Sequence, residues 1–263
     1  MNPIDARRPN LQRIYALESW SELLRALRMP MYSLPTVLFP VMFYVMFGLV
    51  FSSGRPVLGN VSMATYLLAT YGVFGVVGAA LFGFGVGVAI ERGQGWLQVK
   101  RASPMPPGAL FFAKMTMSLV FGLTIVLLLS ALAVAFGGVT ISVERWLGLV
   151  GTLVAGAIPF CAFGLALGFL LGPNSAVPVV NLIYLPMGFL SGLWIPIQVL
   201  PEALKQFAQF LPPYHFAQLA LKFLDASRGE PVALHLGVLV AFTVICLLVA
   251  TWAYRRDSGK SYG

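Results

Sequence analysis

Charged residues are scarce in this sequence. Only 10% of its 263 residues are Asp, Glu, Lys or Arg, whereas 59% are hydrophobic and the mean hydropathy is +0.86. Soluble domains contain about 25% charged and about 45–50% apolar residues. The composition therefore indicates a membrane protein. The polar residues lie in short connectors, so we expect no separate water-soluble domain.

Cysteine and histidine are scarcer still. Cys161 and Cys246 both lie inside apolar runs, which argues against a disulfide framework and predicts two buried packing residues. His215 and His235 have no acidic partner at metal-ligand spacing, so no metal site is expected. His215 lies at a predicted membrane edge, and we interpret it as an interfacial hydrogen-bonding residue.

Two short motifs that suggest chemistry fail on inspection. "SGKS" at 258–261 lacks the glycine of a phosphate-binding loop, because Tyr254 stands at the required position, and a membrane segment precedes it. "GFLSG" at 188–192 only loosely resembles a serine-hydrolase elbow, which has one residue on each side of the serine. We interpret the first as a solvated tail and predict no catalytic residues.

Six segments are long and apolar enough to cross a bilayer, which takes about 20 residues. Their predicted bounds are 31–51, 63–90, 109–136, 146–171, 177–200 and 232–254. The expected fold is an all-α membrane protein with a six-span domain over 31–254, an N-terminal segment 1–30 and a tail 255–263. Glycines four positions apart, such as Gly164 and Gly168, predict close helix contacts.

Ionisable residues stand only at or near the ends of these segments. A charge at the bilayer centre costs about 2.5–3.5 kcal/mol and persists where function needs it. The absence of such charges disfavours an ion-driven carrier. An ion-driven carrier or a passive pore acting alone stays the alternative to a transporter that takes its energy from elsewhere.

The basic residues predict the orientation. Twelve of the 17 Lys and Arg lie in the N-terminal segment, in or beside the loop after the second span, or in the tail. The positive-inside rule places these parts, and both termini, in the cytoplasm. Because the basic residues cluster beside apolar spans, the net charge of +8 indicates membrane orientation rather than nucleic-acid binding.

Residues 16–28 have the pattern of an amphipathic helix. One face is apolar and the other polar, which predicts a helix lying on the cytoplasmic leaflet with its indole at headgroup depth. Whether this helix only anchors the first span or also touches a cytoplasmic partner stays open. The apolar face carries Leu17, Trp20, Leu23, Leu24 and Leu27, and the polar face carries Glu18, Ser21, Glu22, Arg25 and Arg28.

The fifth predicted span differs from the others because prolines interrupt it. Such a segment is tolerated at membrane depth only when it is buried in protein or lines a cavity. The following stretch, 201–231, has helical apolar spacing around Pro212 and Pro213, too short on either side to span. We expect one or two re-entrant or interfacial helices there, forming an outer lid.

The order of these parts resembles the membrane subunit of type-2 ATP-binding-cassette (ABC) exporters, in the drug- or antibiotic-exporter-like branch. That family has an amphipathic N-terminal helix, two spans, a charged cytoplasmic loop, here "ERGQGWLQVKRASPMPP", and four further spans. "GFLSGLWIPIQVLPEALKQFAQFLPPYHFAQLAL" resembles the family's "SG…P…LP…LP" pattern, carried here by Ser191, Gly192, Pro196, Pro201, Pro212 and Tyr214. In the family this pattern commonly ends with an arginine or glutamine a few residues past the second LP, and Gln218 is the nearest candidate for it here.

The resemblance implies that the chain carries no ATPase and no cofactor of its own. Two copies of a separate cytoplasmic subunit would hold ATP and Mg, and a second permease chain, identical or homologous, would complete an export path in the bacterial inner membrane. The dimer seam would involve spans one and five.

The resemblance also implies that the loop over 91–108 contains a coupling helix that seats in a groove of the ATPase. Glu91 and Arg92 end the second span, Gly93 and Gly95 permit the turn, and the prolines after Ser103 stop the helix. Trp96, Leu97 and Val99 are the expected apolar anchors, with Lys100 and Arg101 beside them in water.

The sequence says little about the substrate. The chain contains 20 Phe, 9 Tyr and 5 Trp, and an uncharged, aromatic-rich interior suits hydrophobic or amphipathic cargo, such as an antibiotic, a drug or a lipid-like molecule. It suits a polyanionic polysaccharide less well.

Overall fold

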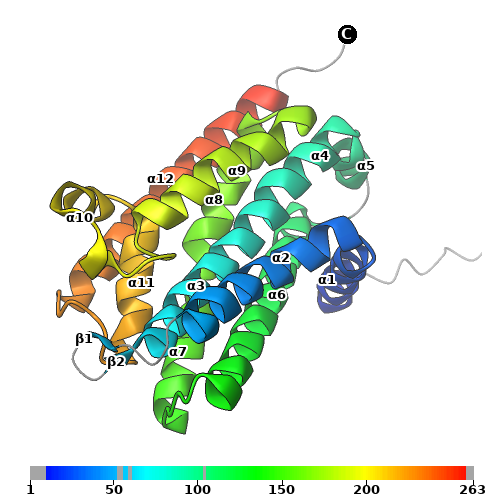
Figure 1. Ribbon diagram of the computed structural model, residues 1–263. Helices are drawn as coiled ribbons and strands as arrows, with labels where there is room; N and C mark the ends of the chain where they lie inside the picture. The colour runs from blue at the N-terminus through cyan, green and yellow to red at the C-terminus, as the bar shows by residue number, and fades with distance from the viewer. Residues whose placement is uncertain (1–9, 52–55, 59–60, 103–104, 259–263) are drawn as a thin grey trace, which may run out of the picture.

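The structure is a computed structural model that describes residues 10–51, 56–58, 61–102 and 105–258. Within these ranges the chain is almost entirely helical (Figure 1). The all-α membrane fold expected from the sequence is confirmed. Arg7, Arg8, Arg55 and Lys260, which were among the basic residues counted for the predicted orientation, lie outside the described residues.

The first half of the chain contains a crossing helix and three long rods. Helix α1 precedes α2, which continues as a π-helical segment, η1; α3, a second π-helical segment η2, and α4 form one unbroken rod. A small antiparallel pair, β1 and β2, joins the first two rods. The bounds are α1 Leu11–Leu27, α2 Pro30–Phe43, η1 Tyr44–Val50, β1 Pro56–Leu58, β2 Val61–Ser62, α3 Met63–Ala80, η2 Leu81–Val86, α4 Gly87–Gly93, α5 Trp96–Ala102 and α6 Pro107–Phe136.

The second half begins with two helices in line and ends with α12, a long helix that is mostly exposed. Gly156 separates α7 from α8, and two short helices follow α9 before the final rod. The bounds are α7 Val143–Ala155, α8 Ala157–Leu170, α9 Pro173–Leu190, the 3-10 turn η3 Ile197–Val199, α10 Glu202–Ala208, α11 Pro212–Lys222 and α12 Val232–Ser258.

Five helical rods of the described chain are long and apolar enough to cross a membrane: Pro30–Val50, Met63–Gly93, Gly108–Phe136, Val143–Leu170 and Val232–Arg256. They match five of the six predicted spans within three residues at either end. The segment predicted over 177–200 differs, because its helix runs from Pro173 to Leu190. The chain then turns at Gly192, whose φ is +75°, so the predicted end at 200 is wrong by ten residues.

Helix α3 forms the centre of the bundle. Nearly every one of its residues is buried, and it packs against α2, α6, α8 and α11. Helix α9 is fastened to it by Tyr184, whose hydroxyl donates to the Phe74 carbonyl at 2.8 Å while its ring stacks on that of Phe74. Because a buried hydroxyl without a partner is costly, this bond fixes α9 against the core.

Glycines allow α8 to approach the central rod closely. A Cβ at Gly164 would lie 3.0 Å from the Ala80 carbonyl oxygen, and one at Gly168 would lie 3.0 Å from that of Phe84. Small residues permit such backbone contact in membranes, where lipid gives helices no hydrophobic reason to associate. The helix contact predicted from this spacing is confirmed.

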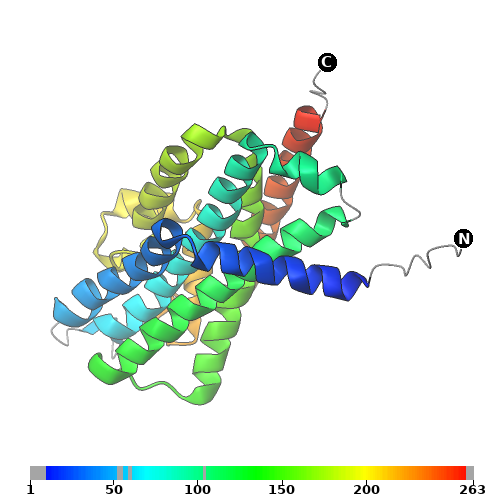
Figure 2. The ribbon, with the colours of Figure 1, turned by 90° about the vertical axis from the view of Figure 1, so that its right-hand side faces the viewer.

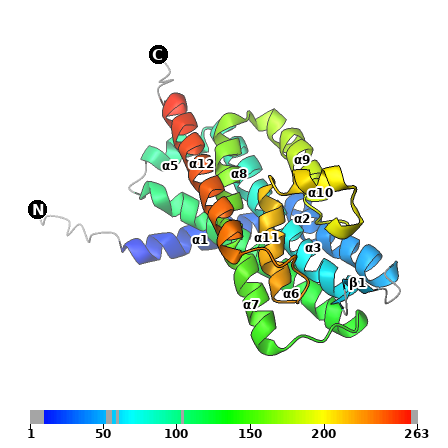
Figure 3. The same ribbon diagram turned by 90° about the vertical axis from the view of Figure 1, so that its left-hand side faces the viewer.

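The two ends of the bundle differ in their parts. Helix α5 and the end of α12 lie at one end, whereas α10, α11 and the small sheet lie toward the other (Figure 1). Helix α1 packs on α6 and crosses it obliquely (Figure 2). Helices α7, α11 and α12 face the viewer from the opposite side (Figure 3).

Gly156 offers a test of this packing. A Cβ there would stand 2.0 Å from the ring of buried Phe216, whereas one at Gly151, in the preceding helix, would meet no atom within 4 Å. Overpacking costs about 1–3 kcal/mol. We therefore expect Gly156→Ala to lower the thermal unfolding temperature of the purified protein clearly more than Gly151→Ala does. Equal effects would contradict the described packing.

Candidate functional site

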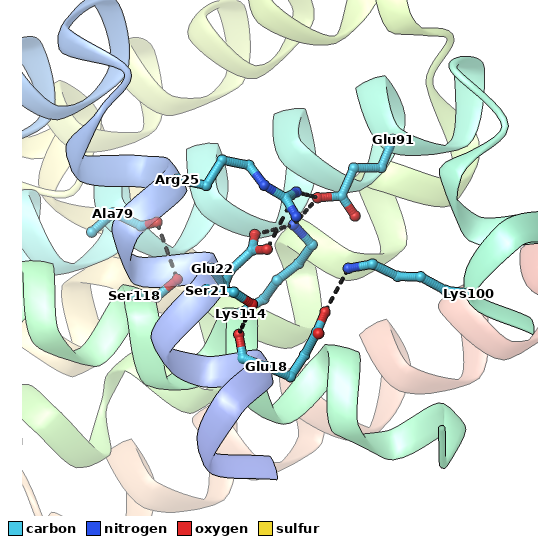
Figure 4. Close-up of polar contacts among 9 residues, drawn as sticks. All are labelled: Glu18, Ser21, Glu22, Arg25, Ala79, Glu91, Lys100, Lys114 and Ser118. Carbon is cyan, nitrogen blue, oxygen red and sulfur yellow. Dashed lines mark hydrogen bonds and ion pairs between the residues drawn. The ribbon is translucent and has the colours of Figure 1, made fainter. Parts of the chain in front are cut away.

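Four charged side chains meet at the end of the bundle that carries α5. The Lys114 ammonium donates to Glu22 Oε1 at 2.6 Å and to Glu91 Oε1 at 2.9 Å. The Arg25 guanidinium lies 2.5 Å from Glu91 Oε1 and 3.3 Å from Glu22 Oε2. Figure 4 shows these side chains converging from α1, α4 and α6. We call this group the four-charge cluster; its formal charge is zero.

The spacing along α1 creates this arrangement. Glu18, Glu22 and Arg25 stand four and three residues apart, so they share one face of the helix. Each meets a different element: Glu18 accepts from Lys100 of α5 at 2.6 Å, Glu22 from Lys114 of α6, and Arg25 pairs with Glu91 of α4. Helix α1 is therefore tied to both flanks of the loop and to the loop helix itself.

The cluster is largely shielded from water. Lys114 is 1% exposed, Glu22 4% and Glu91 6%, while Arg25 reaches the surface. Burial favours the neutral form of Glu22, but the positive charge and hydrogen bond of Lys114, together with Arg25 and Lys100, outweigh it and lower the pKa of Glu22. Buried charges persist when they are paired in this way.

The lowered pKa gives a pH-dependent prediction. Folding favours ionised Glu22, so its contribution to stability is present above its ordinary pKa of 4.5 and is lost as the pH falls through the lower folded value. We expect the unfolding temperature of the wild type to fall as the pH drops below about 4.5. Glu22→Gln should remove part of this dependence, whereas Glu202→Gln, at an exposed side chain, should preserve it.

The structure qualifies the prediction for the N-terminal helix. The helix exists, begins after the N-cap Asn10 and exposes Leu17, Trp20 and Leu27, while Leu24 is half-buried. Of its polar face, Glu18 and Glu22 are turned toward the protein, whereas Ser21, Arg25 and Arg28 are exposed. Helix α1 thus has an exposed apolar surface and holds the bundle through its charges.

The chain turns at the end of α4 through glycines. Gly95 has φ +76°, a conformation that side-chain-bearing residues rarely adopt. A Cβ at Gly93 would stand 2.5 Å from the Pro173 ring, so the glycine allows α9 to approach α4 closely. Arg92 donates to the carbonyl oxygens of Phe169 and Leu171, and thereby holds the end of α8.

Helix α5 follows the turn and exposes two of the three predicted anchors. Trp96 is 54% exposed and Val99 is 60% exposed, whereas Leu97 is buried in the core. Lys100 is mostly covered by its pairing with Glu18, so it is not simply solvated as expected. Arg101 belongs to α5, and its side chain lies outside the described part of the chain.

Residues of the late signature shape the opposite end of the bundle. Ser191 is buried at the end of α9, Gly192 supplies the left-handed turn, and Pro196 precedes η3. Pro201 precedes α10, and Pro212 begins α11. The expected short helices over 201–231 are present, with their break at the predicted prolines.

Two buried histidines, distant in sequence, meet beside these helices. His215 Nδ1 lies 2.9 Å from His235 Nδ1, and His215 Nε2 donates to the Gln209 carbonyl at 2.8 Å. Tyr214 donates to Glu230 at 2.9 Å, and burial together with this bond raises the pKa of Tyr214 to about 12. Sequence spacing gave no signal of this pair, because it depends on how α11 packs on α12. The described residues contain no group of three or more metal ligands.

The comparisons with known proteins agree with this architecture. Residues 15–224 match the family model described as ABC-2 type transporter. A protein of Bacillus subtilis (strain 168) named as transport permease YvfS is 26% identical over 91% of this chain and 96% of its own length. Nodulation protein J of Rhizobium leguminosarum bv. viciae is 37% identical over 43% of this chain and 45% of its own.

The family model spans most of α1, the four-charge cluster, α5, α10 and α11, whereas α12 with His235 lies beyond the matched residues. A permease of this kind is a membrane subunit and not itself the catalytic one, and it associates with an ABC ATPase subunit. The chain belongs to the ABC-2 type transporter family, as a multi-pass transport permease subunit of an ABC transporter.

Proposed function

We propose that this permease exports hydrophobic or amphipathic molecules, such as an antibiotic, a drug or a lipid-like compound, out of the cytoplasm or inner leaflet, driven by ATP. Two cytoplasmic ATPase subunits bind ATP and Mg and seat against α5. Two permease chains, identical or homologous, pair along α2 and α9, with six spans each, both termini in the cytoplasm and the inner membrane of a bacterium as location.

One observation carries the proposal. Trp96 and Val99 are exposed on a short helix that ion pairs hold in place: Lys100 of this helix pairs with Glu18, and Glu91 before it pairs with Arg25. Exposed aromatic side chains held on a rigid support are typical anchors of protein interfaces. A force applied to α5 would pass directly to α1 and, through Lys114, to the third rod.

The coupling mechanism follows from the same contacts. Closure of the ATPase subunits would push α5 toward the membrane, and the ion pairs would move α1 with it. Nucleotide shifts such an equilibrium only by binding one state more tightly than the other. The four-charge cluster therefore transmits the movement of the ATPase to the spans.

Transport by reconstituted protein tests the proposal. The permease and its ATPase are placed in liposomes, and efflux of a fluorescent amphipathic dye is followed with ATP, without ATP, and under an ion gradient alone. ATP-dependent efflux that fails without the ATPase is the expected result. Efflux by the permease alone under an ion gradient would favour the carrier, and efflux without any energy source would favour the pore.

A further inference from the structure

A deep groove on the face opposite α1 is not used by this mechanism. It encloses about 800 Å³ and lies between α7–α8, α11 and α12. This volume falls within the about 300–1,000 Å³ of small-molecule sites. Three of the helices that bound it, α7, α11 and α12, are turned toward the viewer in Figure 3.

The walls of the groove are apolar. Leu236, Val240 and Val244 of α12 follow at four-residue spacing and face Phe216 and Leu219 of α11. The hydroxyl of Thr243 is already used, because it donates to the Leu239 carbonyl at 2.7 Å. A groove of this kind in a bilayer is filled by hydrocarbon rather than by water.

The depth of the groove matches half of a membrane. It follows α12 from Val232, the first residue of the helix, to Val244. Twelve residues of α-helix rise about 18 Å, and one leaflet contributes about 15 Å of hydrocarbon. The groove therefore reaches from one membrane surface to about the bilayer centre.

The rim at that surface is basic. Lys222 and Arg145 both line the groove, and Lys222 is exposed without an ion-pair partner among the described residues. Arg145 lies 2.5 Å from Asp225 Oδ2. The rim thus carries two positive charges and one negative charge, a balance that complements one negative charge on a ligand.

We propose that this groove binds a phospholipid of the outer leaflet that has a singly charged anionic headgroup. Its acyl chains lie along α12 and its phosphate lies at Lys222 and Arg145, since basic side chains between membrane helices attract such headgroups. A second copy of the chain fits less well, because a two-fold contact would bring the same basic rim of both chains together. The assignment to the outer leaflet rests on the orientation in the proposed function.

Lipid titration of the purified full chain, followed by native mass spectrometry, tests the site. The probes are phosphatidylglycerol and phosphatidylcholine with identical acyl chains. We expect the anionic lipid to bind about tenfold more tightly, the effect of one charge-assisted contact. Lys222→Gln should remove this preference. Lys205→Gln, at a basic residue that does not line the groove, should retain it.

A second pair of variants tests the apolar part. Val240→Trp fills the groove and should reduce the binding of both lipids, whereas Leu248→Trp, at an exposed residue of the same helix outside the groove, should not. Equal affinity for the two lipids, or a preference that survives Lys222→Gln, would overturn the proposal. So would lipid binding that Val240→Trp leaves unchanged in a protein that unfolds at the wild-type temperature.

The orientation is tested separately. Both native cysteines are buried, so Lys222→Cys should be labelled in intact cells by a membrane-impermeant maleimide. Labelling only after permeabilisation would overturn the outer-leaflet assignment and the proposed orientation together. A flat lipid titration would overturn the lipid site alone.

Discussion

A Lys114→Met variant is expected to lose about 3–5 kcal/mol of stability, because removing one partner of a buried ion pair leaves uncompensated charge. Lys114 stands between Glu22 and Glu91 and is 1% exposed. Without it, two buried carboxylates share only Arg25. We expect a large fall in the unfolding temperature and release of α1 from α6.

The control and the rescue sharpen this test. Lys205→Met, at a surface pair with Glu202, should cost at most about 1 kcal/mol. Adding Glu22→Gln to Lys114→Met removes the excess negative charge and should restore part of the lost stability. If Lys114→Met costs no more than Lys205→Met, the four-charge cluster does not hold α1 in place.

Trp96→Ala is expected to weaken binding of the ATPase subunit at least about 30-fold, the effect of losing an interface anchor worth about 2 kcal/mol. The side chain is more than half exposed, so the substitution should leave the unfolding temperature of the permease nearly unchanged. The measurement is the dissociation constant of the purified permease and ATPase.

Trp252→Ala is the matched control for this prediction. Trp252 is 56% exposed but belongs to α12 and not to the loop, and Arg256 lies over its ring. It should leave ATPase affinity unchanged. A dissociation constant that Trp96→Ala does not alter would contradict the docking of the ATPase on α5 and would favour α1 as the element that contacts the ATPase.

Local features were predictable because they depend on neighbouring residues alone. Five spans match the structure, and the loop helix ends at Ala102, just before the predicted proline stop. The fifth span was extended too far, since apolar composition continues past Leu190 while the backbone turns at Gly192. Hydropathy measures solubility in lipid, and it does not register a reversal of the chain.

The candidate site was predictable only in part. Its loop was identified from charge, glycine and proline, and from the family resemblance. Leu97, however, faces the core while Trp96 and Val99 do not. Which residues of a seven-residue helix are buried depends on the side of the helix that the bundle covers. The composition of the loop therefore does not predict which of the three anchors is buried.

The sequence by itself determined that the protein lies in a membrane, where its spans lie and where prolines end its helices. About 20 consecutive apolar residues favour a membrane span, and a proline stops a helix, through local chemistry alone. Only the tertiary structure decided which neighbours cover each face. Glu22, Glu91 and Lys114 come from three separate segments, and Glu22 lay on the polar face of the predicted amphipathic helix. Buried charges acquire partners through packing, and packing brings together residues that no sequence spacing connects.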